Sequence, residues 1–308
     1  MSVVRGLSGG TEFEESKTFT ENADSKQKYH QRTNINMSKI QIGCETYTWQ
    51  MPGEQYKGKL EHIMNISAQA GFKGIEPETS FFQHLADPAQ MKEALSQSGQ
   101  ALPVLCLVED WRWPEETAEE KANADQWISF LQHFPDTLLL LVQMPGKDRE
   151  DLVERQQNLL SCVNQVAQRA ADQGIECSYH PNSPGGSIYR TAEDYKILLN
   201  GLDERVIKYT PDIGHIAKGG MDPLAIIREY RSLVNCVHYK DMYTDGRWAA
   251  LGEGNIDMDA ITKELRDSNF EGWIIVEDEC DEAITNPDQV TLNAGAYVEK
   301  VMRPLLNN

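Results

Sequence analysis

The sequence predicts an eightfold β/α barrel, the (β/α)8 fold of the α/β class, and three observations carry this prediction. Eight short apolar runs alternate with longer helical stretches from residue 39 onward, which fits eight strand–helix units. Most runs are apolar throughout rather than alternating, as in strands of a sheet covered by helices. No GxGxxG or GxxxxGK[ST] fingerprint opens any unit, which disfavours the alternative, a doubly wound open sheet.

The predicted strands follow in order along the chain, and their ranges are 39–45, 74–78, 102–108, 137–143, 174–180, 206–212, 234–241 and 273–279. Several begin after a glycine or a turn, as in "AGFKGIE" and "FEGW". The clearest helix between them covers 150–173, where leucine, valine and alanine recur on one face. These ranges place one strand before each helical segment.

The first 37 residues differ from the rest of the chain. Their sequence, "GLSGGTEFEESKTFTENADSKQKYHQRTNIN" for the most part, is polar and nearly free of aliphatic residues. Such a segment buries too little apolar surface to offset its ordering entropy. We therefore predict a disordered or loosely docked extension over 1–37 and a single barrel domain over 38–308.

The composition excludes several kinds of partner. The 308 residues include 48 acidic and 29 basic ones, a formal net charge of −19 that disfavours nucleic acid and anionic membrane surfaces. Small ligands remain open, and so does a homo-oligomer. The six cysteines form no CxxC pair and are expected to be buried, reduced thiols. Without a signal peptide or an 18-residue apolar stretch in this sequence, we expect a cytoplasmic protein.

Polar residues follow the predicted strands at their C-terminal ends, where barrels of this class carry their chemistry. They are Glu45, Glu76, Gln143, His180, Asn182, Asp212, His215, His238, Lys240, Asp241, Glu277 and Glu279. His180, Asp212, His238 and Glu277 come from strands five to eight, which are adjacent in a barrel, and together they predict a site for one divalent metal ion. Each residue alone has an ordinary alternative: a hydrogen-bonded histidine, a helix-capping Asp212, or a solvated acidic cluster around Glu277.

The motifs "YHPN", "DIGHIAKGGMDP", "VHYKD", "LGEGNIDMDAI" and "GWIIVEDE" occur in the order typical of one superfamily. From about residue 39 to the C-terminus the chain resembles the xylose isomerase-like TIM barrels. It is most similar to their sugar phosphate isomerase/epimerase branch, with inosose dehydratases, hydroxypyruvate isomerases and ketose 3-epimerases. The resemblance implies metal ligation by Asp212, His238 and Glu277. The fifth-strand ligand of the epimerases is usually Glu, and position matching puts His180 there in preference to Glu176.

The resemblance also implies the chemistry. We expect an isomerase or epimerase that uses one Mn²⁺, Mg²⁺, Co²⁺ or Zn²⁺ ion and removes a proton next to a metal-bound carbonyl of a small polyhydroxylated substrate. Glu277 is the expected base, His215 is expected to donate to a substrate oxygen, and Lys240 is expected to stabilise the enolate. Because His180 replaces a glutamate, symmetric two-carboxylate epimerisation is in doubt, and dehydration of a keto-cyclitol is the alternative.

Further substrate contacts are expected from Gln143, Asn182, Glu253 in "LGEGNID" and Trp113 in "EDWRWP". The resemblance implies that Glu76 orients either a substrate hydroxyl or His215. Loop packing explains Trp113 equally well, and a turn explains Glu253.

Two other functions were weighed. The repair nucleases of the superfamily need histidines on strands three and four and an Asp-x-His pair after strand seven, none of which occurs here. A sugar-binding barrel without catalytic activity stays open because His180 departs from the epimerase pattern.

Overall fold

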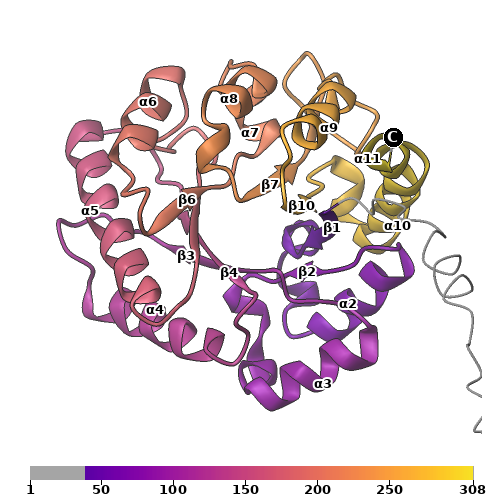
Figure 1. Ribbon diagram of the computed structural model, residues 1–308, viewed down its shortest axis with the longest axis horizontal. Coiled ribbons are helices and arrows are strands. Elements are labelled where there is room, and N and C mark those ends of the chain that lie inside the picture. Colours follow the sequence, from indigo (N-terminus) through magenta and orange to yellow (C-terminus); the bar gives the residue numbers. More distant parts are fainter. Residues whose placement is uncertain (1–38, 308) are drawn as a thin grey trace, which may run out of the picture. The chain divides into compact units, whose positions relative to one another are not determined.

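The computed structural model describes residues 39–307, and the predicted extension over 1–37 lies outside the described residues. Eight parallel strands form the centre of the molecule, and helices surround them (Figure 1). The strands are β1 (Ile40–Glu45), β2 (Ile75–Glu76), β3 (Val104–Glu109), β4 (Leu138–Gln143), β5 (Cys177–His180), β6 (Ile207–Tyr209), β7 (Cys236–Tyr239) and β10 (Gly272–Val276).

The strands close into a barrel. They form two four-stranded sheets, ordered β2-β1-β10-β7 and β3-β4-β5-β6. Parallel bridges join the sheets at both seams: Gly74 pairs with Ala101 between β2 and β3, and Asp212 pairs with His238 between β6 and β7. Every strand therefore has two neighbours, and the predicted barrel is confirmed.

All eight strands are shorter than predicted, and proline accounts for the early ends of β2 and β6. Pro77 follows β2 and Pro211 comes soon after β6, so the chain lacks a backbone N–H where the ladder would continue. Beyond each proline the backbone makes only single bridges, such as Glu78 with Cys106. The ends of these strands are free to place side chains over the barrel opening.

The helices are α2 (Leu60–Gln69), α3 (Pro88–Ser98), α4 (Ala118–Leu131), α5 (Leu152–Ala171), α6 (Ala192–Gly201), α7 (Ile213–Lys218), α8 (Pro223–Glu229), α9 (Met258–Asp267), α10 (Pro287–Tyr297) and α11 (Arg303–Asn307). Thr117 and Thr191 begin α4 and α6 with complete capping boxes. The helix predicted over 150–173 is α5, which buries Leu159 and Val163 among other residues. No helix of residues 39–307 combines the length and apolar character needed to cross a bilayer.

The core of the described residues has three parts, the smallest of which joins Cys280, Ala283 and Val290. The largest cluster lies between strands and helices, and a second one joins Val104, Cys106, Leu138, Leu140, Cys236 and Ile275. The second cluster unites side chains of β3, β4, β7 and β10, strands on opposite sides of the ring, so it fills the barrel interior. All six cysteines are buried free thiols, as predicted.

A short antiparallel hairpin, β8 (Asp241–Met242) and β9 (Trp248–Ala249), follows β7 and was not predicted. Its turn contains Asp245 and Gly246, and Gly246 has a left-handed φ of 85°. An Asp-Gly pair is a common hairpin signal, so the sequence did carry the information.

Candidate metal centre

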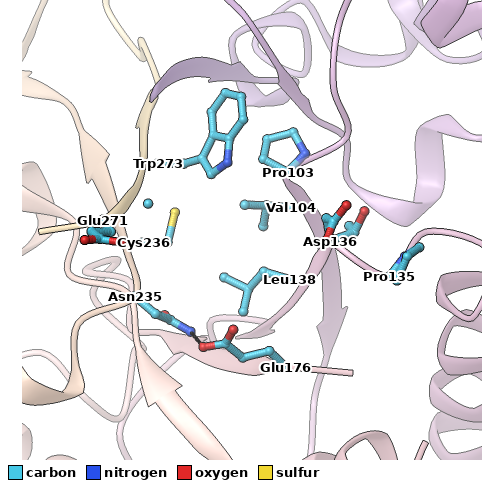
Figure 2. Close-up of a pocket in the computed structure, with 12 residues that line it drawn as sticks. Pro103, Val104, Pro135, Asp136, Leu138, Glu176, Asn235, Cys236, Glu271 and Trp273 are labelled. Atoms are coloured by element: carbon cyan, nitrogen blue, oxygen red, sulfur yellow. Dashed lines mark hydrogen bonds between the residues drawn. The ribbon is translucent and has the colours of Figure 1, made fainter. Parts of the chain in front are cut away.

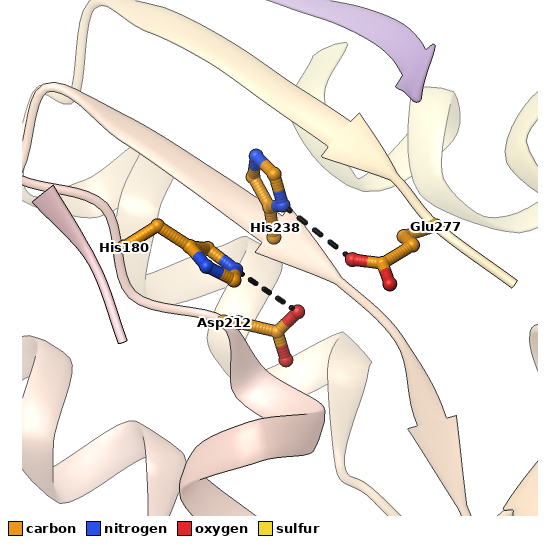
Figure 3. A group of neighbouring side chains, drawn as sticks. All are labelled: His180, Asp212, His238 and Glu277. Atoms are coloured by element: carbon orange, nitrogen blue, oxygen red, sulfur yellow. Dashed lines mark ion pairs between the residues drawn. The ribbon is translucent and has the colours of Figure 1, made fainter. Parts of the chain in front are cut away.

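Four side chains from consecutive strand ends meet at one point (Figure 3). His180, Asp212, His238 and Glu277 are all buried, and one ligand atom of each lies within 4.8 Å of the others. His180 Nε2 is 3.5 Å from Asp212 Oδ2, and His238 Nδ1 is 3.7 Å from Glu277 Oε2. The structure thus brings together the four residues predicted to bind metal.

Asp212 combines two roles that the sequence offered as alternatives. It is the N-cap of α7, and its Oδ1 accepts a 2.6 Å hydrogen bond from the backbone N–H of His215. Its Oδ2 is buried and has no hydrogen-bond partner. The cap fixes the carboxylate so that this second oxygen faces His180.

Glu76 fixes the orientation of the His238 ring, although Glu76 is not one of the four grouped residues. Its Oε2 lies 3.0 Å from His238 Nε2, and both side chains are buried. This contact leaves Nδ1 of His238 facing two carboxylates, Glu45 Oε2 at 3.5 Å and Glu277 Oε2 at 3.7 Å. A carboxylate that fixes the ring of a ligating histidine is a recurrent feature of metal sites. The partner of Glu76 within the protein is therefore His238 rather than His215, and the expected contact with a substrate hydroxyl stays a prediction.

Lys240 provides a fully buried cation beside the group. Its Nζ lies 2.6 Å from Glu277 Oε1 and 3.7 Å from Asp212 Oδ2, and it also contacts Glu279. Burial alone would lower the pKa of Lys240, but Glu277 and the other carboxylates raise it well above its usual value. Lys240 therefore stays charged.

His215 uses both ring nitrogens for contacts with the protein. Burial, reinforced by the charge of Lys240, lowers the pKa of His215 to about 3, so the ring is neutral. Because an ammonium can only donate, Nε2 of His215 accepts from Lys240 Nζ at 3.1 Å. Nδ1 then carries the proton and donates to Ser183 Oγ at 2.8 Å. Both ring nitrogens of His215 therefore have protein partners in this arrangement, and donation from His215 to a substrate oxygen stays a prediction.

The carboxylates around Lys240 differ in acidity. Burial opposes ionisation of Glu277, yet Lys240 and His238 hold its pKa well below the usual range. Burial and the neighbouring Glu277 and Glu76 raise the pKa of Glu45 well above its usual value. Burial likewise raises the pKa of Glu279 to about 7, although Lys240 opposes the shift. The site therefore pairs an ionised Glu277 with carboxyl groups that tend to hold protons.

A cavity of about 380 Å³ opens over these residues at the C-terminal ends of the strands. Seven of the predicted residues line it: Glu76, Gln143, His180, Asn182, His215, His238 and Glu277. The amides of Gln143 and Asn182 are engaged by the backbone, since Asn182 Nδ2 donates to the carbonyl of Gln143 and Gln143 Nε2 donates to the carbonyl of Asp110. The cavity is large enough for a small cyclic substrate.

Two predicted substrate contacts lie elsewhere. Trp113 is 59% exposed and lines a separate surface depression with Glu109 and Asn123. Glu253 is exposed and does not line the cavity. Glu253 lies in a turn, its simpler alternative, whereas Trp113 is mostly exposed and borders the surface depression rather than the cavity.

The sequence pattern did not indicate several residues that line the cavity, namely Tyr47, Ser183, Lys218 and Trp248. Glu45 and Glu279 also line it; both are among the strand-end residues of the sequence, but no role was predicted for them. Trp248 depends on the hairpin, so recognising the Asp-Gly turn was the only sequence route to it.

The residues of the group fit a divalent cation. Three of the four candidate ligands bury an atom that has no hydrogen-bond partner within residues 39–307: His180 Nε2, Asp212 Oδ2 and His238 Nδ1. Buried polar atoms without partners are costly, and a metal ion at their meeting point would satisfy all three. Imidazole nitrogens and carboxylate oxygens are also a common donor set for Zn²⁺ and similar ions.

A second cavity, of about 360 Å³, lies at the opposite, N-terminal ends of the strands (Figure 2). Val104, Leu138, Cys236 and Trp273 are among its lining residues, with Glu176 and other acidic residues also present. Glu176, the fifth-strand residue set aside in favour of His180, bonds Asn235 there and is remote from the metal centre.

Residues 64–301 match the family described as xylose isomerase-like TIM barrel. Among curated relatives, an inosose dehydratase from Clostridium beijerinckii is 25% identical over 86% of this chain and 98% of its own length.

Solved structures share the fold. An IOLI protein with a bound zinc atom gives a TM-score of 0.68 at 14% identity, covering 85% of this chain and 98% of that one. A D-psicose 3-epimerase with D-tagatose, from Clostridium cellulolyticum H10, gives 0.63 at 14% identity, covering 85% and 99%.

Proposed function

The chain belongs to the xylose isomerase-like TIM barrel family, and from this membership we propose that it is a divalent-metal-dependent dehydratase of a keto-cyclitol of the inosose type. The observation that carries the proposal is the group of His180, Asp212, His238 and Glu277 around buried atoms without partners. The inosose dehydratase relative, matched over almost its full length, supports the reaction. Dehydration thus replaces isomerisation or epimerisation as the first choice.

The same four residues would hold one divalent ion. The zinc atom of the IOLI protein supports a metal in this fold, and the donor set is also compatible with Mn²⁺, Mg²⁺ and Co²⁺. When bound, the ion polarises the substrate carbonyl and so acidifies the neighbouring C–H bond.

The chain's own residues perform the proton transfers. The ionised Glu277 removes the proton from the carbon next to the carbonyl, and the electron pair moves onto the carbonyl oxygen. Lys240 stabilises this negative charge because its ammonium is buried and prepositioned. The electron pair then moves back from the oxygen to form a C=C bond, and the C–O bond to the hydroxyl on the next carbon breaks. The hydroxyl leaves as water with the proton that Glu277 took up, which returns Glu277 to its ionised form.

Isomerisation or epimerisation is the second candidate, and the 3-epimerase with the same fold favours it. It shares the first proton abstraction and differs in returning a proton to carbon. Epimerisation between two opposed carboxylates lacks its second base here because His180 occupies the fifth-strand position.

Product analysis separates the two reactions. The metal-loaded protein is incubated with an inosose and, in parallel, with a panel of ketoses, and products are followed by NMR. We expect loss of water from the inosose to give an unsaturated or diketone product, and no such product with Glu277→Gln. An epimer or isomer formed without loss of water would contradict the dehydratase and support the second candidate.

A further inference from the structure

Trp248 lies against the two side chains that accompany the metal centre. Its ring centroid is 4.9 Å from Lys240 Nζ and 5.6 Å from the ring of His215, which it meets nearly edge-on at 77°. Lys218 Nζ lies 5.0 Å from the same ring and also bonds the carbonyl of Gly246 in the hairpin turn. An indole face attracts ammonium groups strongly where water is excluded.

The hairpin that carries Trp248 is held by one buried carboxylate. Asp241 is 1% exposed, and it accepts hydrogen bonds from four backbone N–H groups. Those of Met242 and Gly254 are 2.8 Å long, that of Gly252 is 3.1 Å, and that of Ile256 is 3.3 Å. We call Asp241 with these four amides the Asp241 clamp.

The clamp is closely packed and is linked to Trp248 by strand pairing. A Cβ atom on Gly254 would lie 2.2 Å from Asp241 Oδ1, so only glycine allows the loop to approach the carboxylate this closely. Met242, one residue after Asp241, pairs directly with Trp248 in the β8–β9 ladder. Asp241 also follows Lys240 in the chain, so the clamp fixes the backbone on both sides of the buried ammonium.

We propose that Asp241 and Trp248 are positioning residues: the Asp241 clamp holds the hairpin so that the Trp248 ring fixes Lys240 and His215 beside Glu277. This inference rests on the proposed function for its kinetic test but not for its structural test. Lys240 has three N–H donors and four polar neighbours, Glu277, Glu279, Asp212 and His215. The Trp248 ring packs against the ammonium group of Lys240 and so restricts its position among these neighbours.

The kinetic experiment compares Trp248→Leu, Trp248→Phe, Asp241→Asn and the double variant Asp241→Asn/Trp248→Leu. Trp248→Leu should lower kcat about tenfold with little change in KM, because Lys240 loses its position while the metal centre stays intact. Trp248→Phe keeps an aromatic face and should recover most of this loss. Asp245→Asn is the matched control, since Asp245 is an exposed hairpin carboxylate paired with Arg247, and its kcat should equal that of the parent.

The double variant decides whether the clamp acts through Trp248. If it does, Asp241→Asn should lower kcat much less in the Trp248→Leu background than in the parent, a non-additive cycle. Fully multiplicative losses would overturn the inference, as would Trp248→Leu raising KM alone, which would make Trp248 a substrate contact.

Hydrogen exchange tests the clamp without any substrate. In the metal-loaded protein, Asp241→Asn should speed exchange in the peptides that cover 241–256, with metal content unchanged, because an amide cannot accept as many hydrogen bonds as a carboxylate. Unchanged exchange would overturn the clamp. If no variant or parent turns over a keto-cyclitol but exchange rises as expected, the proposed function fails and the clamp stands.

Discussion

Asp212 is the residue whose two oxygens have separable functions, one capping α7 and one facing His180. Asp212→Ala should abolish stoichiometric metal binding and remove activity with it, because the remaining residues leave one ligand position empty. Loss of the cap should also cost about 0.5–2 kcal/mol of stability. Metal content by elemental analysis and thermal unfolding check the two effects.

The matched control is Asp222→Ala. Asp222 caps α8 in the same manner, accepting from the backbone N–H of Leu224 at 3.0 Å, and does not line the cavity. It should lose comparable stability and keep its metal. Full metal occupancy in Asp212→Ala would contradict the ligand assignment.

The variant Glu76→Gln tests whether the contact of Glu76 with His238 positions that ring for metal binding. Glu76→Gln should weaken metal affinity by roughly 10–100-fold without abolishing it, since the amide cannot hold the histidine ring as the carboxylate does. Isothermal titration of the metal-free protein with Zn²⁺ measures this change. Glu78→Gln is the control, because Glu78 bonds Gln50 and Ser80 and has no contact with His238; equal affinity losses in both variants would argue against a specific role for Glu76.

Strand-end position predicted the ligand-type residues because each strand of a closed barrel delivers its last side chains to the same opening. His180, Asp212, His238 and Glu277 could therefore be grouped without a structure. Hydrogen-bond partners could not be predicted. The pairings of Glu76 with His238 and of His215 with Lys240 depend on rotamers and strand stagger, which the strand pattern does not encode.

Among the elements, α5 was predicted from its apolar face, and the stability of variants on its two faces tests that prediction. Leu159 is fully buried on its inner face, whereas Val153 on the same helix is 66% exposed. Leu159→Ala should destabilise the protein by about 2–5 kcal/mol through lost burial and the cavity left behind. Val153→Ala should change stability by less than about 0.5 kcal/mol. Denaturant titration compares them, and similar values would show that the helix is packed on a different face.

The elements that the sequence did not predict are short ones. The β8–β9 hairpin has two residues per strand, too few for any periodic pattern, and proline shortened β2 and β6 below their apolar runs. The position of Trp113 outside the cavity could not be predicted for a related reason. It lies on a loop, where the pattern of the strands gives no direction to a side chain.

At the scale of the whole molecule, the domain boundary is a prediction that rests on composition. Removing residues 1–36 should leave the melting temperature and the metal content unchanged, because this segment contributes few aliphatic side chains to a core. Differential scanning calorimetry and elemental analysis of the truncated chain check this. A truncated protein that fails to fold would place the boundary elsewhere.

If the metal ion and Glu277 together remove a proton from the carbon next to the substrate carbonyl, exchange of that hydrogen with solvent deuterium should require both. An inosose is incubated in D₂O with the metal-loaded protein, with chelator-treated and reloaded samples, and with Glu277→Gln, and NMR follows deuterium at the carbon next to the carbonyl and in the product. Exchange or water loss should occur with the loaded protein, disappear on chelation, return on reloading, and be absent from Glu277→Gln. Exchange that is undiminished in Glu277→Gln, or that persists without metal, would contradict this mechanism.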